Sequence, residues 1–185
     1  MTGTTITATT TTTRIERNGR AWQDSGMRIL LALAVALLAS PALTAEWGHY
    51  VNERFGVEAD VPPGFAPAAP PANGDGQRFA TPTAELSIYG SLIVEGDFES
   101  NVAWRMAWNG QDGWNITYQA VTPSWASWSG KKGSRIFYAR AIRMCGGDAI
   151  GAFELEYSEA DLKAFDPVVE RLARSLKDSG IGWQC

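Results

Sequence analysis

Glu154 and Glu156 are the two residues that come nearest to a catalytic pattern. Side chains two positions apart on a strand point to the same face, so these carboxyl groups could act as the paired acids of a glycosidase. The alternative is structural, because Arg135, Arg140 and Arg143 lie on the neighbouring predicted strand and could pair with the acids across the sheet. We favour the ion pairs, and the sequence therefore assigns no catalytic residue.

The tryptophans between residues 104 and 128 are the feature most open to a functional interpretation. Exposed indoles stack on sugar rings and anchor peptides, whereas buried indoles fill cores. Trp104 and Trp108 are four apart and share one side of a predicted helix, with Trp104 offset by about 160° from Val102. The candidate binding residues are Trp104, Trp108, Trp125 and Trp128. The alternative interpretation is that all four indoles pack in the core.

Residues 70–79, PPANGDGQRF, have some of the side chains of a calcium loop. The EF-hand pattern, aligned on Asp75 and Gly76, places Pro71 at the first ligand position and Pro82 at the last. Neither proline has a side-chain oxygen to offer a metal. Asn-Gly and Asp-Gly also accept positive φ at little cost, so the stretch predicts a turn that leads into a strand.

Two further matches to catalytic or metal-binding patterns are weak. Ser129 and Lys132 have the S-x-x-K spacing, but Gly130 lies between them and the segment reads as a hairpin, so no helix holds both side chains on one face. His49 is the only histidine, and a single imidazole lacks a second fixed ligand for copper. The sequence indicates no metal and no cofactor.

Residues 27–45, MRILLALAVALLASPALTA, have the pattern of a secretory signal peptide. A membrane span needs about 20 apolar residues, and the apolar run here is roughly half that length before Ser40 and Pro41 interrupt it. We expect cleavage near Ala45 and delivery to the periplasm or the medium, with no stable membrane span afterwards. Residues 1–26 are Thr-rich and predict a disordered leader or translated upstream sequence, and we favour Met27 as the start. A start at Met1 is the alternative, in which the long polar leader could impair cleavage and leave the apolar segment as an anchor.

The remaining residues, 46–185, have the length of a single domain. Removing residues 1–45 takes away four Arg, one Glu and one Asp, so the formal charge moves from −4 to −6. Nucleic-acid phosphates require clustered Lys and Arg, so this acidic chain is a poor candidate for binding nucleic acid.

Cys145 and Cys185 are the only cysteines in the chain. In an oxidising compartment two thiols of one domain usually form a disulfide, and the absence of a C-x-x-C motif favours a structural bond over a redox role. Closing a loop of about 41 residues should stabilise the fold by roughly 4 kcal/mol.

Hydrophobic periodicity predicts the elements that must position these side chains. Alternation over residues 57–61 indicates a strand, residues 77–81 and 85–91 form a predicted hairpin, and residues 114–157 form a predicted antiparallel meander. A helix is predicted from Phe98 to about Asn109, capped by Asp97.

The chain is predicted to pass Ser158 into a closing helix whose strongest part starts at Asp166-Pro167, a capping residue followed by proline at the first helical position. Val169, Leu172 and Leu176 form its predicted buried stripe. The expected fold class is α+β, an antiparallel sheet with helices packed on it.

Four stretches resemble a group of small exported bacterial proteins of unknown function and, more distantly, the PsbP-like α/β/α sandwich: YVNERFGVEADVPPGF, NGDGQRF before a hairpin ending in LSIYG, WASWSG followed by RIFYAR, and FDPVVERLARSL. The resemblance covers nearly all of residues 47–177. It implies the sandwich fold and an accessory or binding role, and it supplies no catalytic residues.

The function predicted from the sequence is a non-catalytic accessory or binding module of the periplasm or cell envelope, with an envelope protein or a glycan as its partner. The alternative is an envelope hydrolase that acts on cell-wall or saccharide substrates with Glu154 or Glu156 as the acid.

Overall fold

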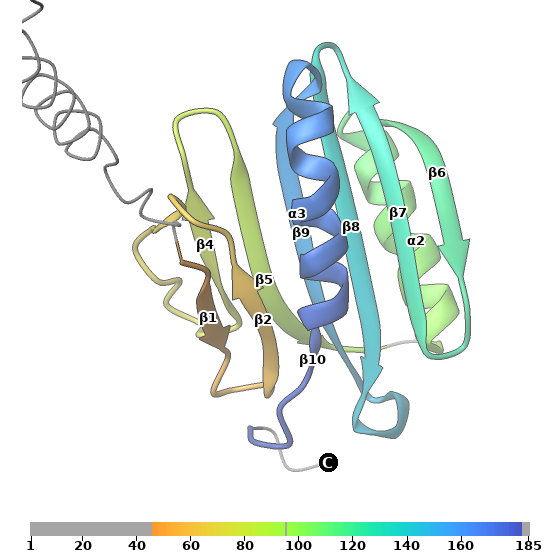
Figure 1. The fold of residues 1–185 in the computed structure, drawn as a ribbon. Helices are drawn as coiled ribbons and strands as arrows, with labels where there is room; N and C mark the ends of the chain where they lie inside the picture. The colour runs from red at the N-terminus through yellow and green to blue at the C-terminus, as the bar shows by residue number, and fades with distance from the viewer. Residues whose placement is uncertain (1–45, 95, 183–185) are drawn as a thin grey trace, which may run out of the picture. The chain divides into compact units, whose positions relative to one another are not determined.

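A seven-stranded antiparallel sheet forms the centre of the fold (Figure 1). The computed structural model describes residues 46–94 and 96–182, so the predicted leader and signal peptide and Cys185 lie outside the described residues. The strand order is β3-β4-β5-β9-β8-β7-β6. The bounds are β3 Ala66–Pro67, β4 Gly76–Ala80, β5 Glu85–Leu92, β6 Asn115–Val121, β7 Trp125–Lys132, β8 Arg135–Met144 and β9 Ala149–Ser158.

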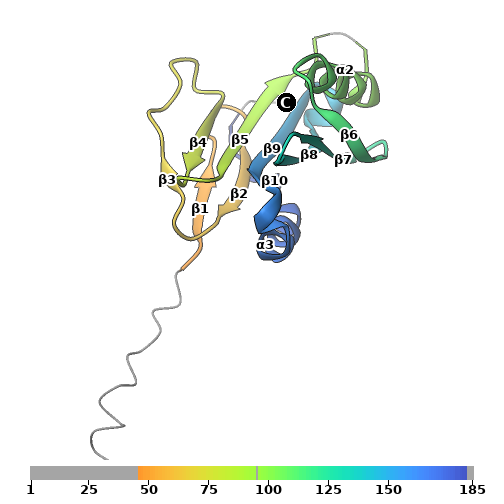
Figure 2. The ribbon, with the colours of Figure 1, turned by 90° about the horizontal axis from the view of Figure 1, so that it is seen from above.

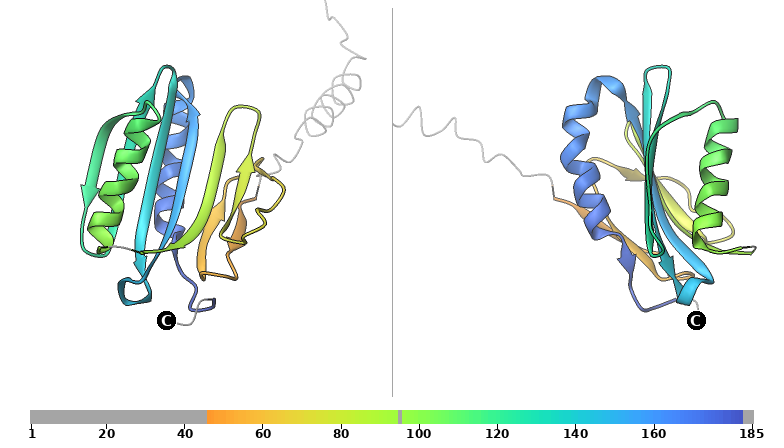
Figure 3. Two further views of the ribbon diagram at one scale, coloured as in Figure 1. Left: turned by 180° about the vertical axis from the view of Figure 1, so that it is seen from behind. Right: turned by 90° about the vertical axis from the view of Figure 1, so that its right-hand side faces the viewer.

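Two helices cover opposite faces of this sheet, as Figures 2 and 3 show. Helix α2, Phe98–Gln111, lies on one face, and helix α3, Leu162–Ser175, lies on the other. A three-stranded sheet in the order β1-β2-β10 lies beside α3 and is built from Gly48–Val51, Val57–Val61 and Lys177–Asp178. Short 3-10 turns occupy Cys145–Gly147 and Glu159–Asp161. The predicted α+β class, with helices packed on an antiparallel sheet, is confirmed.

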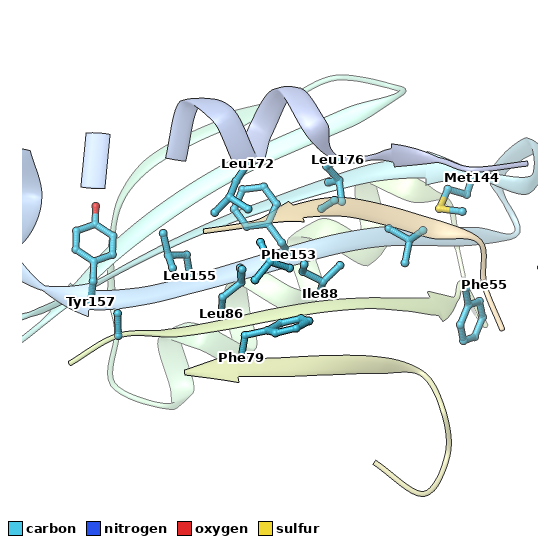
Figure 4. Packing of buried hydrophobic residues seen from close by; sticks show 14 of the residues in the cluster. Phe55, Phe79, Leu86, Ile88, Met144, Phe153, Leu155, Tyr157, Leu172 and Leu176 are labelled. Carbon is cyan, nitrogen blue, oxygen red and sulfur yellow. The ribbon is translucent and has the colours of Figure 1, made fainter. Parts of the chain in front are cut away.

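Two buried clusters hold the layers together. On the α3 face, Leu172 and Leu176 pack toward Phe153, Leu155 and the side chains of β5 (Figure 4). Fully burying an aliphatic or aromatic side chain of this size stabilises the fold by about 1.5–3 kcal/mol. The second cluster lies under α2 and contains Phe98, Val102, Trp128, Phe137 and Ile150, among others.

The hairpin β4-β5 and the meander from β6 to β9 form as predicted. Helix α2 also begins as predicted, because the side chain of Asp97 accepts a hydrogen bond from the backbone N–H of Ser100 at 2.8 Å.

The chain enters the closing helix after Ser158, as predicted, but the predicted capping role of Asp166 is wrong. Helix α3 begins at Leu162, so Asp166 and Pro167 lie within it rather than at its first turn. Phe165 stacks on Tyr157 at 4.5 Å between ring centroids, and this contact stabilises a turn that the proline pattern did not indicate. Of the predicted stripe, Leu172 and Leu176 are buried and Val169 is partly buried.

The small sheet β1-β2-β10 was not predicted, because it joins two ends of the domain that are far apart in sequence.

Neither α2 nor α3, the α-helices of the described part of the chain, is long and apolar enough to cross a membrane.

Candidate binding groove

Helix α2 leaves part of its sheet face uncovered. It lies over β6, β7 and β8, while the same face of β5 extends beyond it (Figure 3). A pocket of about 310 Å³ lies along this side of α2 and is lined by Tyr89, Trp104, Arg105, Trp108, Asn109, Asp112, Trp128 and Glu154. We call it the α2 groove. It shares Trp104 and Arg105 with one neighbouring pocket and Tyr89 and Glu154 with another.

Trp104 and Trp108 form the outer wall of the α2 groove. Their rings lie 5.7 Å apart between centroids, inclined by 31°, and the residues are 58% and 53% exposed. The periodicity of the helix explains this exposure, because Val102 is fully buried and Trp104 lies about 160° from it around the helix axis. The two indoles are therefore open to a ligand.

Arg105 ties α2 to strand β5. Its Nε donates to Oδ1 of Asn101 at 2.9 Å, Nη1 to the hydroxyl of Tyr89 at 3.2 Å, and Nη2 to Oγ of Ser91 at 2.6 Å. The guanidinium carbon lies 5.5 Å from the centre of the Tyr89 ring. Burial raises the pKa of Tyr89. All three guanidinium nitrogens are thus engaged within the protein.

Glu154 and Glu156 share a face of β9, as predicted, but their surroundings differ. Oε1 of Glu156 accepts a hydrogen bond from Nε of Arg135 at 2.8 Å, which is one of the predicted ion pairs. Glu154 lies in the α2 groove opposite the small side chain of Ala139. Burial, together with the negative charge of Glu156, raises the pKa of Glu154, while a hydrogen bond with Asn109 opposes this rise.

The other two arginines proposed to pair with these acids have different partners. Nη1 of Arg140 donates to Oγ of Ser127 at 3.1 Å, and Nη2 of Arg143 donates to the carbonyl of Gly146. Arg140 points to the α3 face, where its guanidinium carbon lies 4.5 Å from the centre of the Trp125 ring.

The four candidate tryptophans therefore do not form a single surface. Trp104 and Trp108 line the α2 groove, whereas Trp125 lies on the opposite face of the sheet. Trp128 is only 1% exposed, and its Nε1 donates to Oδ1 of Asn109 at 2.9 Å. Its buried indole thus holds Asn109, which lines the α2 groove, by a hydrogen bond. A ligand-binding role for these tryptophans stays a prediction.

The turn at residues 73–76 is held by hydrogen bonds to its own chain. Nη1 of Arg54 donates to Oδ1 of Asp75 at 2.5 Å and to the carbonyl of Asn73 at 2.6 Å. Nδ2 of Asn52 donates to the carbonyl of Gly74 at 2.8 Å, and Gly74 has a φ of 66°. These contacts support the structural interpretation, since Arg54 already neutralises the carboxylate of Asp75.

The remaining sequence candidates are separated from the α2 groove. Ser129 and Lys132 lie on β7 at an odd separation, so they point to opposite faces. His49 lies on β1, with Nδ1 at 3.2 Å from Oδ1 of Asp60 and Nε2 at 3.5 Å from Oε2 of Glu58.

Cys145 follows β8 in a left-handed conformation, with a φ of 50°. No cysteine that the structure describes is a free thiol. Its predicted partner, Cys185, lies outside the described residues, so the pairing of the two stays a prediction.

Sequence reasoning did not identify Tyr89, Arg105, Asn109 or Asp112 as site residues. The i, i+4 spacing of Asn101 and Arg105 could have indicated a side-chain pair on the helix surface. Nothing local could have placed Tyr89 beneath Arg105, because the strand and the helix meet only in the tertiary structure.

No family model matches the chain, and no curated protein matches it. Solved structures are similar in fold. The cyanobacterial PsbP protein (CyanoP) from Synechocystis sp. PCC 6803 superposes with a TM-score of 0.58 at 14% identity, covering 75% of this chain and 96% of that chain. The Ran-binding protein Mog1p of Saccharomyces cerevisiae gives a TM-score of 0.56 at 7% identity, covering 74% of this chain and 97% of that chain. The likeness shows a PsbP-like fold.

Proposed function

We propose that residues 46–185 form an exported, non-catalytic binding module of the periplasm or cell envelope that holds a partner protein in the α2 groove. The observation that carries this proposal is the pair Trp104 and Trp108, which are more than half exposed and lie beside each other. Tryptophan is enriched among the residues that dominate binding energy at protein interfaces. The groove is preorganised, because Arg105 and Asn109 are already hydrogen-bonded to side chains of the sheet.

Two further observations support the proposal. Mog1p, which has a similar fold, is a Ran-binding protein and so binds another protein.

The proposal of export rests on the signal-peptide pattern of residues 27–45. N-terminal sequencing of the secreted or periplasmic pool should find a chain that begins at or near Glu46, and recovery of Met1 or Met27 from that pool would contradict export with cleavage.

The experiment that tests the groove compares two variants in capture of envelope proteins. The double variant Trp104→Ala with Trp108→Ala removes both exposed indoles, and Tyr118→Ala removes an aromatic ring that is 49% exposed on β6, outside the α2 groove. We expect the same partner to be recovered with the unaltered domain and with Tyr118→Ala, and to be lost with the double variant. Equal recovery with all three would refute the groove as the binding site.

Hydrolysis of a saccharide remains a second candidate because of one observation. The pKa of Glu154 is raised by burial, which is the usual state of a glycosidase acid. The ion pair between Glu156 and Arg135 counts against the two-carboxylate mechanism, since it engages the second acid. Incubation with peptidoglycan and chromogenic glycosides should give no turnover. Turnover that disappears in Glu154→Gln would replace the binding proposal with the enzyme.

A further inference from the structure

The α2 groove is lined by two acidic residues and one basic residue, Arg105. Glu154 and Asp112 line the same pocket as Trp104 and Trp108. Nζ of Lys132 donates to the main-chain carbonyl of Asp112 at 2.6 Å rather than to its carboxylate. Neither carboxylate forms an ion pair with a described Lys, Arg or His, whereas Glu156 pairs with Arg135.

The α2 groove also contains one cation, Arg105, whose charge attracts Glu154. Arg105 directs its three guanidinium nitrogens to Asn101, Tyr89 and Ser91. Its position over the Tyr89 ring also shows that an aromatic face in this groove already accepts a cation. A second cation would meet two exposed indoles and two carboxyl groups that form no ion pair with a described residue.

We propose that the α2 groove takes a lysine or arginine side chain of the partner protein, with its charged group against the indoles of Trp104 and Trp108 and facing Glu154 and Asp112. This inference rests on the proposed binding function and adds the chemistry of the recognised group. Indole is the aromatic ring that attracts cations most strongly, and the carboxylates supply the charge complementarity that sets specificity.

A binding cation should also change the protonation of Glu154. Burial and the negative charges of Glu156 and Asp112 raise the pKa of Glu154, while Asn109 and the positive charge of Arg105 oppose the rise. The balance is a raised pKa, so Glu154 keeps its proton to a higher pH than an exposed Glu does. A cation in the groove favours the ionised form and so lowers that pKa. Binding should therefore release protons in weakly acidic buffer, and an uncharged sugar that only stacks on the indoles should not.

The test uses a matched pair of peptides on the domain of residues 46–185, the secreted form expected after cleavage. Tri-lysine is the probe, and tri-(Nε-acetyl-lysine) has nearly the same shape without the positive charges. Binding is followed through the NMR signals of the indole N–H groups, assigned with single Trp→Phe variants. We expect tri-lysine to shift the signals of Trp104 and Trp108 and to bind at least about five-fold more tightly than the acetylated peptide.

Variants separate the α2 groove from general attraction between a basic peptide and an acidic protein. Trp108→Leu keeps an apolar side chain but removes the π face, and should weaken tri-lysine binding by about five-fold. Asp112→Asn and Glu154→Gln should also weaken it. Glu53→Gln removes a charge of the same kind at an exposed position outside the groove and should have no such effect.

Three outcomes would overturn the inference: equal binding of the two peptides, equal weakening by Glu53→Gln and Asp112→Asn, or shifts at Trp104 and Trp108 caused by a neutral oligosaccharide but not by tri-lysine. If tri-lysine fails while the double variant still loses its captured partner, the binding function stands and only the cationic group is wrong. If both experiments fail, both proposals are wrong.

Discussion

The indole Nε1 of Trp128 donates a hydrogen bond to Oδ1 of Asn109 at 2.9 Å, and this bond joins strand β7 to helix α2 beneath the groove. Trp128 is fully buried, whereas Asn109 lines the pocket and lowers the pKa of Glu154. The core of the sheet therefore positions a side chain of the binding surface.

Trp128→Phe should lower the free energy of unfolding by about 1–3 kcal/mol, because it removes this hydrogen bond and leaves a cavity. Trp108→Phe is the matched control, and it should change the free energy by no more than about 0.5 kcal/mol, because Trp108 is 53% exposed. Urea unfolding measures both values. Equal destabilisation by the two substitutions would contradict the contrast between supporting and exposed tryptophans.

The raised pKa of Glu154 should appear in the pH dependence of stability. The folded protein holds a proton on Glu154 at pH values where the unfolded chain, with its ordinary value of 4.5, has lost it. The free energy of unfolding should therefore fall as the pH rises from about 4.5 through the folded-state pKa. Glu154→Gln cannot titrate, so it should lack this loss.

Urea unfolding at a series of pH values measures this difference between the unaltered protein and Glu154→Gln. Glu53→Gln removes an exposed acid outside the groove and is the control for the loss of one negative charge. A parallel curve for Glu154→Gln would show that Glu154 titrates like an exposed acid.

Gly90 is required by the close approach of the loop after β1. A Cβ added at Gly90 would lie 2.3 Å from Cβ and 2.5 Å from Cγ of Phe55, a residue that is buried. Gly90→Ala should therefore destabilise the fold by about 1–3 kcal/mol.

Gly110 on helix α2 is the opposite case and serves as the control. A Cβ there would meet nothing within 4 Å, so Gly110→Ala should stabilise the protein by about 0.5–1 kcal/mol. Thermal or urea unfolding of both variants decides the matter, and a loss of stability in Gly110→Ala would contradict the reasoning.

The predicted bond between Cys145 and Cys185 is tested by alkylation of the exported protein in denaturant without reductant. We expect no labelled thiols, and two per chain would show that the bond is absent. Replacing both cysteines by serine should lower the free energy of unfolding by up to about 4 kcal/mol, because the unfolded chain gains the freedom of an open loop.

The sequence alone determined the local features of the domain. Alternation of side chains predicted β2, the hairpin β4-β5 and the meander, and helical periodicity together with the Asp97 cap predicted α2. The same periodicity placed Trp104 away from the buried Val102. These features depend on neighbours within a few residues, and so the sequence displays them directly.

Only the tertiary structure decided what each candidate side chain does. Glu154 and Glu156 look alike in sequence, but Arg135 engages one and Asn109 contacts the other, because β8 and α2 reach β9 from different parts of the chain. Trp128 and Trp108 likewise have the same side chain and opposite exposure. A helix packs on each face of the sheet, and the alternation of side chains along a strand does not show how much of a face its helix covers. The α2 groove exists because α2 leaves part of its face uncovered.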